Sequence, residues 1–147
     1  MLYLGADHAG FNQKEALKRA LSERSVEFAD LGTDSDAPVD YPIIVEKVIK
    51  AMDLKTDRAI ILCGSGQGVA IAANKFEGIR AAICWDEKVA KETREDNDSN
   101  VLALPSRHIT DAQAIAISNV WLSTKFTNEE RHTRRIDQIA ELERRER

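Results

Sequence analysis

The sequence has no long apolar run and no feature that would mark the chain for export. Its first residues, MLYLGADHAG, contain no basic segment and place Asp7 inside what would have to be an apolar signal sequence. No stretch approaches the ~18 apolar residues needed to cross a bilayer, and 31% of the residues are charged. We therefore expect a cytoplasmic protein with no membrane partner.

Cysteine is scarce as well, and the chain has no surplus of positive charge. The two cysteines, Cys63 and Cys84, have neither metal-ligand spacing nor a CxxC pair, so we expect no metal site and no disulfide framework. The formal net charge is −4, which argues against unspecific nucleic-acid binding, since such proteins need a surplus of Lys and Arg. The densest basic cluster, RHTRR at residues 131–135, is by itself typical of a solvated helix face.

Short apolar or β-branched runs alternate with longer amphipathic stretches, which is typical of βα units around a parallel sheet. A chain of 147 residues with 43% hydrophobic residues suits one domain with one core. We predict a single α/β domain over residues 1–147, a Rossmann-like three-layer α/β/α sandwich. Its five-stranded parallel sheet is built from strands predicted near residues 2–6, 26–30, 58–63, 79–83 and 100–104.

Amphipathic segments between and after these strands predict helices. Pro42 suits the first turn of a helix over residues 41–52, because no backbone N–H is required there. Two further helices are predicted at about 110–123 and 129–145. The long C-terminal helix has a narrow apolar stripe, which we expect to cover a partner subunit and which consists of Ile136, Ile139 and Ala140.

Ligands of such sheets bind outside the carboxyl ends of the strands, where the strand order reverses. If the first strand lies between the second and third, as in the flavodoxin-like order, the crevice lies between GADHAG and CGSGQG. Asp7, His8 and Cys63 would then converge. An imidazole at this place can hold a phosphate or transfer a proton.

The glycine-rich turn after the third strand leads into a helix, so several backbone N–H groups would point at one spot and bind an anion. A tight turn without a ligand is the alternative reading. The turn lacks the Lys-Ser/Thr pair of a Walker A loop and the spacing of a dinucleotide-binding loop, so we expect neither ATP nor NAD as cofactor. Its residues are Gly64, Ser65, Gly66, Gln67 and Gly68.

Cys63 comes directly before this turn, where the positive end of a helix would stabilise a thiolate that acts as base or nucleophile. Its alternative role is a small apolar residue that closes a strand. A redox function is disfavoured because no resolving cysteine lies near Cys63. Cys84 also ends a strand but has no such turn after it, so we assign it to the core.

Five blocks of the chain, in order, resemble the type B ribose-5-phosphate isomerase family, which also includes allose-6-phosphate and galactose-6-phosphate isomerases. They are GADHAGF, GTDSDAPVDYP, ILCGSGQGVAIAANKFEGIRAA, NDSNVLALPSR and RHTRRIDQI. The resemblance implies an aldose–ketose isomerase of the pentose phosphate pathway that needs no metal or cofactor. It also implies a homodimer with active sites shared between the chains, with tetramers left open.

The resemblance implies a role for each candidate residue. Cys63 would be the base that moves a proton from C2 to C1 through an enediolate, and Ser65 would help to move the proton between O1 and O2. The N–H groups from Gly64 to Gly68 and the amide of Asn97 would form the anion hole. Asp7 would hold a sugar hydroxyl, and the phosphate would be bound by His8, Arg107, Arg131 and Arg135.

The chain departs from the family at Asp96, where many members have a histidine that helps to open the cyclic sugar. An aspartate is ordinarily ionised at neutral pH and is a poor proton donor. Three explanations stay open: Asp96 does this work in a suitable environment, another group such as Asp7 opens the ring, or the substrate needs no opening.

We expect the substrates to be ribose 5-phosphate and ribulose 5-phosphate. Allose 6-phosphate, galactose 6-phosphate and erythrose 4-phosphate are alternatives, and the last of these cannot close a furanose ring. A sugar-phosphate binding protein without catalysis is the alternative from another class. The presence of Cys63 argues against it, because a binding protein would not need a thiolate beside the anion site.

Overall fold

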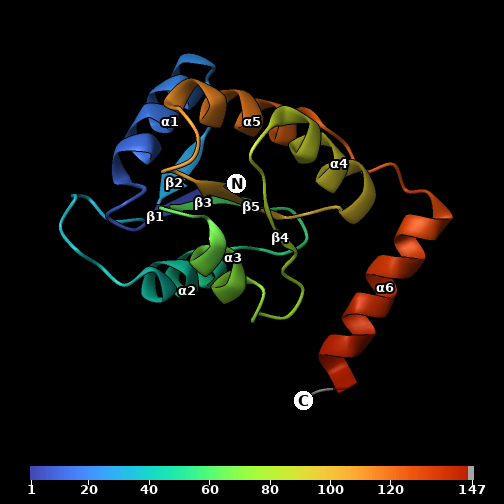
Figure 1. Ribbon diagram of the computed structural model, residues 1–147. Coiled ribbons are helices and arrows are strands. Elements are labelled where there is room, and N and C mark those ends of the chain that lie inside the picture. Colours follow the sequence, from blue (N-terminus) through green and yellow to red (C-terminus); the bar gives the residue numbers. More distant parts are fainter. Residues whose placement is uncertain (146–147) are drawn as a thin grey trace.

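The computed structural model describes residues 1–145, in which parallel strands form one sheet (Figure 1). The order across this sheet is β2-β1-β3-β5-β4. The strands are β1 (Leu2–Ala6), β2 (Phe28–Asp30), β3 (Arg58–Cys63), β4 (Ala81–Ile83) and β5 (Val101–Pro105).

Helices cover both faces of this sheet, which confirms the predicted three-layer α/β/α architecture (Figure 1). One face carries α1 (Phe11–Glu23), α4 (Glu87–Asn97) and α5 (Asp111–Ser123). The other carries α2 (Tyr41–Ala51) and α3 (Gln67–Ala73).

The alternation of side chains along β3 explains why this strand lies at the centre. Ile60 and Leu62 pack in the cluster formed with α1 and α5, whereas Ile61 and Cys63 pack in the cluster on the side of α2 and α3. Each of these four residues is at most 4% exposed. Because both faces of a central parallel strand are buried, the run AIILC at residues 59–63 is continuously apolar rather than alternating.

Two strands begin later than the sequence predicts. Val26 donates its N–H to the carbonyl of Leu21 and so belongs to the turn that ends α1. Ile79 donates in the same way to Phe76, and the Arg80 N–H is bound by the side chain of Asn100. Backbone groups that are used in turns are not available to a sheet ladder, so β2 and β4 have three residues each.

β1 lies between β2 and β3, as the predicted order requires. The chain moves outward from β1 to β2 and then crosses back to β3, so the direction reverses between β1 and β3. The other half of the sheet differs from the flavodoxin-like order, because β5 lies next to β3 and β4 forms the edge. The reversal between β1 and β3 nevertheless fixes the expected ligand crevice.

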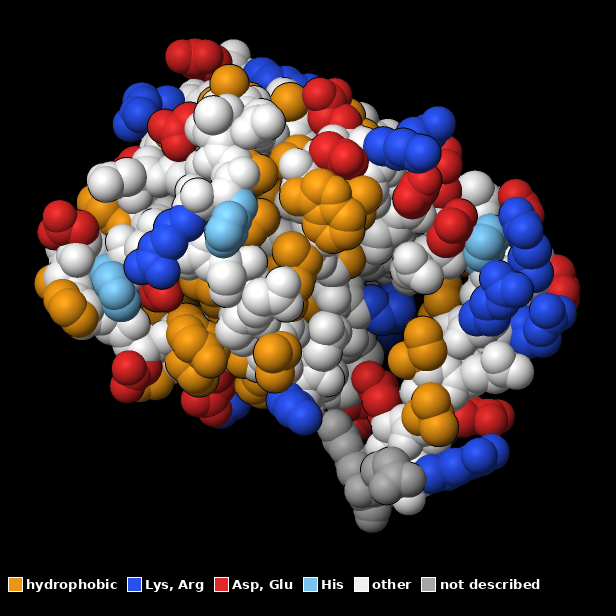
Figure 2. Space-filling model, viewed as in Figure 1, with side chains coloured by type: hydrophobic (Ala, Val, Ile, Leu, Met, Phe, Trp, Pro, Cys, Tyr) orange, Lys and Arg blue, Asp and Glu red, His pale blue; other side chains and the backbone are white. Residues whose placement is uncertain are grey.

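The last helix, α6 (Glu130–Arg145), confirms the predicted long C-terminal helix and projects away from the rest of the domain (Figure 1). Its side chains are partly or fully exposed except for His132, which is buried. Orange apolar side chains lie on the edge of α6 that faces the domain (Figure 2), and Ile139 and Leu142 are 44% and 56% exposed. No helix within residues 1–145 is long and apolar enough to span a membrane.

Candidate active site

A pocket of about 340 Å³ opens where β1 and β3 end. It therefore lies at the predicted crevice, and it brings together Asp7, His8 and Cys63. Two segments far apart in the sequence add Tyr41 and Arg107. The full lining consists of Asp7, His8, Ala9, Tyr41, Cys63, Gly64, Ser65, Gly68 and Arg107.

Asp7 is held rigidly at the end of β1. Its N–H donates to the carbonyl of Leu62 at 3.2 Å, and its carboxylate Oδ1 accepts the Gly10 N–H at 3.1 Å. Gly10 itself lies so close to β3 that a Cβ would be 2.7 Å from Cβ of Leu62. This close approach requires glycine and keeps Asp7, a residue that is 6% exposed, at the pocket wall.

Arg107 lies against the turn that follows Cys63. The N–H of Arg107 donates to the Gly64 carbonyl at 2.9 Å, and the neighbouring Ser106 N–H donates to the Cys63 carbonyl at the same distance. A Cβ at Gly64 would be 2.7 Å from Nη1 of Arg107. The absence of a side chain at Gly64 therefore allows the guanidinium to pack onto the turn beside the cysteine.

The turn itself has the shape that a strand-to-helix connection requires. Gly66 has φ 72°, a left-handed conformation that favours glycine, and α3 begins at the next residue. The Ser65 hydroxyl accepts the N–H of Gln67 at 3.2 Å, so its own hydrogen is free to be donated elsewhere. Gln67 thus contributes to the turn through this bond, and its side chain is not part of the pocket lining.

Sequence reasoning did not single out Tyr41, which lies at the start of α2 and is 37% exposed. Its ring packs on Gly68, where a Cβ would be only 2.5 Å from Cζ of the tyrosine. Only the position of Tyr41 in the sequence could have indicated it, because the loop that leaves the carboxyl end of β2 runs beside the crevice and ends at this residue.

Asp96 and Asn97 do not lie in this pocket. They form the last turn of α4, which leads into the amino end of β5, and Val101 there pairs with Ala59 at the opposite end of β3 from Cys63. Oδ1 of Asp96 is 3.3 Å from Nε2 of His132. Asn97 lines a separate hollow of about 260 Å³, which also includes Ile139 of α6. Because the strands are parallel, these two residues lie near the amino ends of the strands, whereas Cys63 lies at a carboxyl end.

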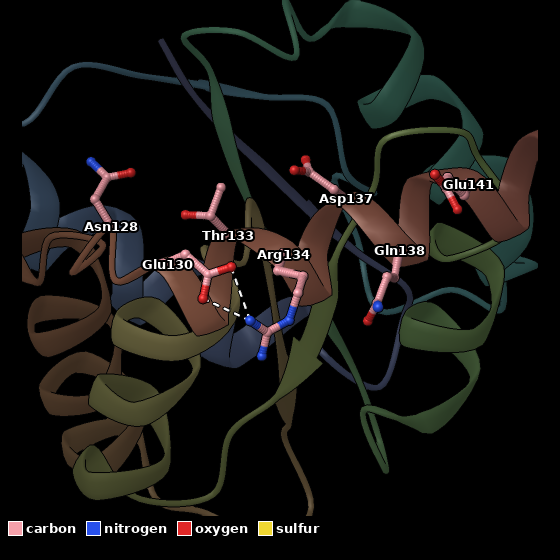
Figure 3. Close-up of a pocket in the computed structure, with 7 residues that line it drawn as sticks. All are labelled: Asn128, Glu130, Thr133, Arg134, Asp137, Gln138 and Glu141. Atoms are coloured by element: carbon pink, nitrogen blue, oxygen red, sulfur yellow. Dashed lines mark hydrogen bonds and ion pairs between the residues drawn. The ribbon is translucent and has the colours of Figure 1, made fainter.

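The two candidate arginines of α6 also lie outside the pocket. Arg131 and Arg135 are exposed, and Nε of Arg131 donates to Glu129 at 2.9 Å. An open hollow of about 580 Å³ lies along this helix. Figure 3 shows the residues that line it, among which Arg134 is paired with Glu130. The lining of this hollow comes from α6 and Asn128 and contains no cysteine or histidine.

The two cysteines have different surroundings. Burial raises the pKa of the Cys84 thiol to about 12, and the carboxylate of Asp86 acts in the same direction. Cys84 is completely buried, as predicted for a core residue. Cys63 is 4% exposed but lies on the pocket wall. Within residues 1–145 no three His, Cys, Asp or Glu side chains are grouped so that they could hold a metal ion.

Comparisons with known proteins match nearly the whole chain. The family model described as Ribose/Galactose Isomerase matches residues 2–139. Ribose-5-phosphate isomerase B of Escherichia coli is 40% identical over 142 residues, which cover 96% of this chain and 95% of that protein. The protein of the same name from Mycobacterium tuberculosis is 37% identical, with 97% and 90% covered.

Solved structures agree with the sequence matches. A structure of ribose-5-phosphate isomerase B from Clostridium thermocellum superposes with a TM-score of 0.95, at 39% identity and with 99% of each chain covered. A ribose 5-phosphate isomerase from Thermotoga maritima gives a TM-score of 0.91 at 40% identity, with 95% of this chain and 97% of that one covered.

Proposed function

The chain belongs to the ribose/galactose isomerase family, and we propose that it interconverts ribose 5-phosphate and ribulose 5-phosphate. The observation that supports this activity best is the pocket at the ends of β1 and β3, where Cys63 lies together with Asp7, His8 and Arg107. A proton-accepting group, hydroxyl-binding groups and a cation are the parts that a phosphosugar isomerase needs in one place.

The reaction requires a proton to leave C2 of the open-chain aldose and to be returned at C1. Cys63 is the base in this proposal, because it lies on the pocket wall next to the guanidinium of Arg107 and the turn from Gly64 to Gly68. A nearby cation and backbone N–H groups stabilise the thiolate before the transfer and the enediolate after it.

Ser65 has the hydroxyl that moves the proton between O1 and O2. Its oxygen is occupied by the Gln67 N–H, so the hydroxyl hydrogen points away from that bond and can be donated to the substrate. Because α3 has only seven residues, we assign the anion stabilisation to the turn amides themselves rather than to the dipole of this helix. The carboxylate of Asp7 holds a sugar hydroxyl.

The positive charge in one pocket is insufficient to balance the charge of a bound phosphate. The ionic side chains on its wall are Asp7 and Arg107, which cancel, whereas a sugar phosphate has up to two negative charges. Additional cations must therefore come from elsewhere. Arg131 and Arg135 are exposed on the projecting helix α6, so we infer that they reach the pocket of a second copy.

The same inference applies to the end of α4, which touches α6. Asp96 and Asn97 cannot reach the Cys63 pocket of their own chain, because they lie near the amino ends of the strands and the pocket lies at the carboxyl ends. We propose that they act in the partner's site of a homodimer, Asn97 in the anion hole and Asp96 in ring opening. His132, 3.3 Å from Asp96, can exchange a proton with this carboxylate and so compensate for its weakness as a donor.

Asp96 also favours specific alternatives to the pentose phosphate. Its side chain is shorter than histidine and leaves room for allose 6-phosphate or galactose 6-phosphate, and erythrose 4-phosphate would need no ring opening. A sugar-phosphate binding protein would share the pocket but would produce no ketose.

The test is incubation of the purified chain in D2O with ribose 5-phosphate, allose 6-phosphate and erythrose 4-phosphate separately. Proton NMR follows ketose formation and deuterium incorporation. We expect rapid conversion of ribose 5-phosphate with deuterium entering at the transferred position. Conversion of only another sugar would replace ribose 5-phosphate as the proposed substrate. The absence of deuterium exchange with all three sugars would contradict an isomerase with these substrates.

A further inference from the structure

The loop between β2 and α2, residues 31–40, is fastened to the end of β1. The N–H of Leu31 donates to Leu4 at 2.8 Å and that of Thr33 donates to Ala6 at 3.1 Å. Gly32 lies between them, where a Cβ would be 2.6 Å from the backbone nitrogen of Ala6. The first part of the loop therefore follows β1 towards the pocket.

The far end of this loop returns to the pocket and contacts His8. The backbone N–H of Val39 donates to Nδ1 of the His8 imidazole at 3.2 Å. Val39 and His8 are both partly buried, and His8 is on the pocket wall. A backbone N–H can only donate, so Nδ1 must be the acceptor in this contact.

From this contact we propose that the Val39 main chain holds neutral His8 as the Nε2–H tautomer, which presents an N–H donor to an anionic oxygen in the pocket. A neutral imidazole has one donor nitrogen and one acceptor nitrogen. With Nδ1 bound to Val39, the hydrogen resides on Nε2, the ring nitrogen left to meet a ligand. Val39 is a positioning residue here, because it acts through His8.

This polarity separates the roles of His8 and Cys63. A histidine that serves as a base usually donates Nδ1–H to a carboxylate or carbonyl, which leaves Nε2 free to accept a proton. The hydrogen bond in this pocket has the opposite direction, so His8 is a donor and does not compete with Cys63 for the proton of the substrate. Two ionic groups share the wall: Asp7, whose Oδ1 is held by the Gly10 N–H, and Arg107.

The tautomer is measured directly by long-range proton–nitrogen NMR of the full chain labelled with 15N. The chain has three histidines, and His8→Gln identifies the signals of His8 by their loss. In the absence of ligand we expect an unprotonated Nδ1 and a protonated Nε2 for neutral His8. A protonated Nδ1 would overturn the proposal.

Two variants at one position test the cause. Val39→Ala keeps the backbone N–H and should leave the tautomer unchanged. Val39→Pro removes the N–H and should return His8 towards the mixture of tautomers found for free imidazole, with a thermal unfolding curve as a check of folding. An unchanged pure tautomer in a folded Val39→Pro variant would show that Val39 is not responsible.

Binding of inorganic phosphate to the unmodified chain and to two His8 variants tests the donor without depending on folding of Val39→Pro. Glutamine can place an N–H near the position of Nε2, whereas asparagine reaches only the position of Nδ1. We expect His8→Asn to weaken phosphate binding about 10-fold and His8→Gln to retain most of it. Equal losses in both variants would contradict the donor role. The identity of the anion rests on the proposed function, but the tautomer does not, so a chain without isomerase activity could still confirm it.

Discussion

The pocket at the ends of β1 and β3 and the projecting helix α6 are built in opposite ways. Pocket residues are fixed by backbone hydrogen bonds, such as those from the Asp7 N–H to the Leu62 carbonyl and from the Arg107 N–H to the Gly64 carbonyl. Helix α6 is held at its root by His132 and Asp96 and near its other end by Glu143, which accepts the Gly78 N–H at 3.0 Å. The pocket residues therefore have a fixed geometry, whereas α6 presents charged side chains on an exposed surface.

Each region has charged or reactive groups that the other lacks. The pocket has a cysteine in a defined place but no excess positive charge. Helix α6 has the arginines but no cavity with catalytic groups. If two copies combine these regions, changes in the pocket should affect the rate of the chemical step, and changes in α6 should affect binding of the phosphate.

The largest effect is expected for Cys63→Ser. A hydroxyl is a far weaker base than a thiolate, so kcat should fall about 10³-fold while inorganic phosphate still inhibits at a similar concentration. Steady-state kinetics with ribose 5-phosphate measures both values. The control is Cys84→Ser, which changes the buried cysteine outside the pocket and should keep kcat. If Cys63→Ser keeps most of its turnover, the base lies elsewhere.

The next effect concerns the stability of the pocket side. Lys14 is fully buried, and its Nζ is 2.5 Å from Oδ2 of Asp30, whose other oxygen accepts the Gly32 N–H. Asp30→Asn removes the carboxylate that Lys14 shares with Lys18, leaves the buried ammonium near Glu15 and the Phe11 ring, and should lower the free energy of unfolding by about 3 kcal/mol. Urea denaturation measures this change.

Glu130→Gln is the matched control on α6. It removes an exposed ion pair with Arg134 and should change the free energy of unfolding by less than about 0.5 kcal/mol. A similar small change for Asp30→Asn would show that the buried pair does not stabilise this side of the domain.

The contribution of Asp30 to the free energy of unfolding should decrease as the pH falls. Burial disfavours ionised Asp30, but hydrogen bonds from Lys14 and Lys18 outweigh it and hold the pKa of this carboxyl below its ordinary value of 3.8. The stabilisation is therefore present above the ordinary pKa and is lost as the pH falls through the lowered one. Below about pH 4 the difference in stability between the unmodified chain and Asp30→Asn should become smaller.

The sequence predicted the pocket because local patterns and one topological rule were sufficient. One buried strand ends directly before Asp7 and another ends at Cys63, and the order of β2, β1 and β3 brings these ends together. Tyr41 was missed because its place depends on the path of an irregular loop and on packing against Gly68. Such contacts have no local sequence period.

The location of Asp96 was harder to derive for another reason. The block that contains it precedes a strand, and in a parallel sheet such a block lies at the amino ends of the strands, away from the ligand crevice at their carboxyl ends. The contact with His132 joins two helices that are distant in sequence and share no repeating pattern. The structure places this block outside the Cys63 pocket of its own chain, which no local pattern in the sequence indicates.

A smaller loss is expected for Asp96→Asn, which keeps the size of the side chain but cannot transfer a proton. Turnover of ribose 5-phosphate should fall about 10²-fold, whereas Asp96→His should preserve or raise it. Progress curves with both variants measure the effect. Unchanged turnover in Asp96→Asn would assign ring opening to another group, and a collapse in Asp96→His would show that the carboxylate has a specific task beside His132.

The arginines of α6 give the smallest single effects and the sharpest test of sharing between chains. Arg131→Ala and Arg135→Ala should each raise KM about 10-fold by removing a charged hydrogen bond to phosphate. Arg134→Ala, which affects only the exposed pair with Glu130, should not change KM.

Mixed dimers decide which chain supplies the arginines. If Cys63 acts with the arginines of the partner, a hybrid of Cys63→Ser with the double variant of Arg131 and Arg135 contains one intact site. Refolding an equal mixture and assaying it well below the KM of the unmodified chain should then restore about a quarter of the unmodified activity, because half of the dimers are hybrids with one intact site each. Recovery requires only that the two sets of residues come from different chains. If all of them act within one chain, every site in the hybrid is damaged, and the mixture is no more active in this assay than the average of its two components.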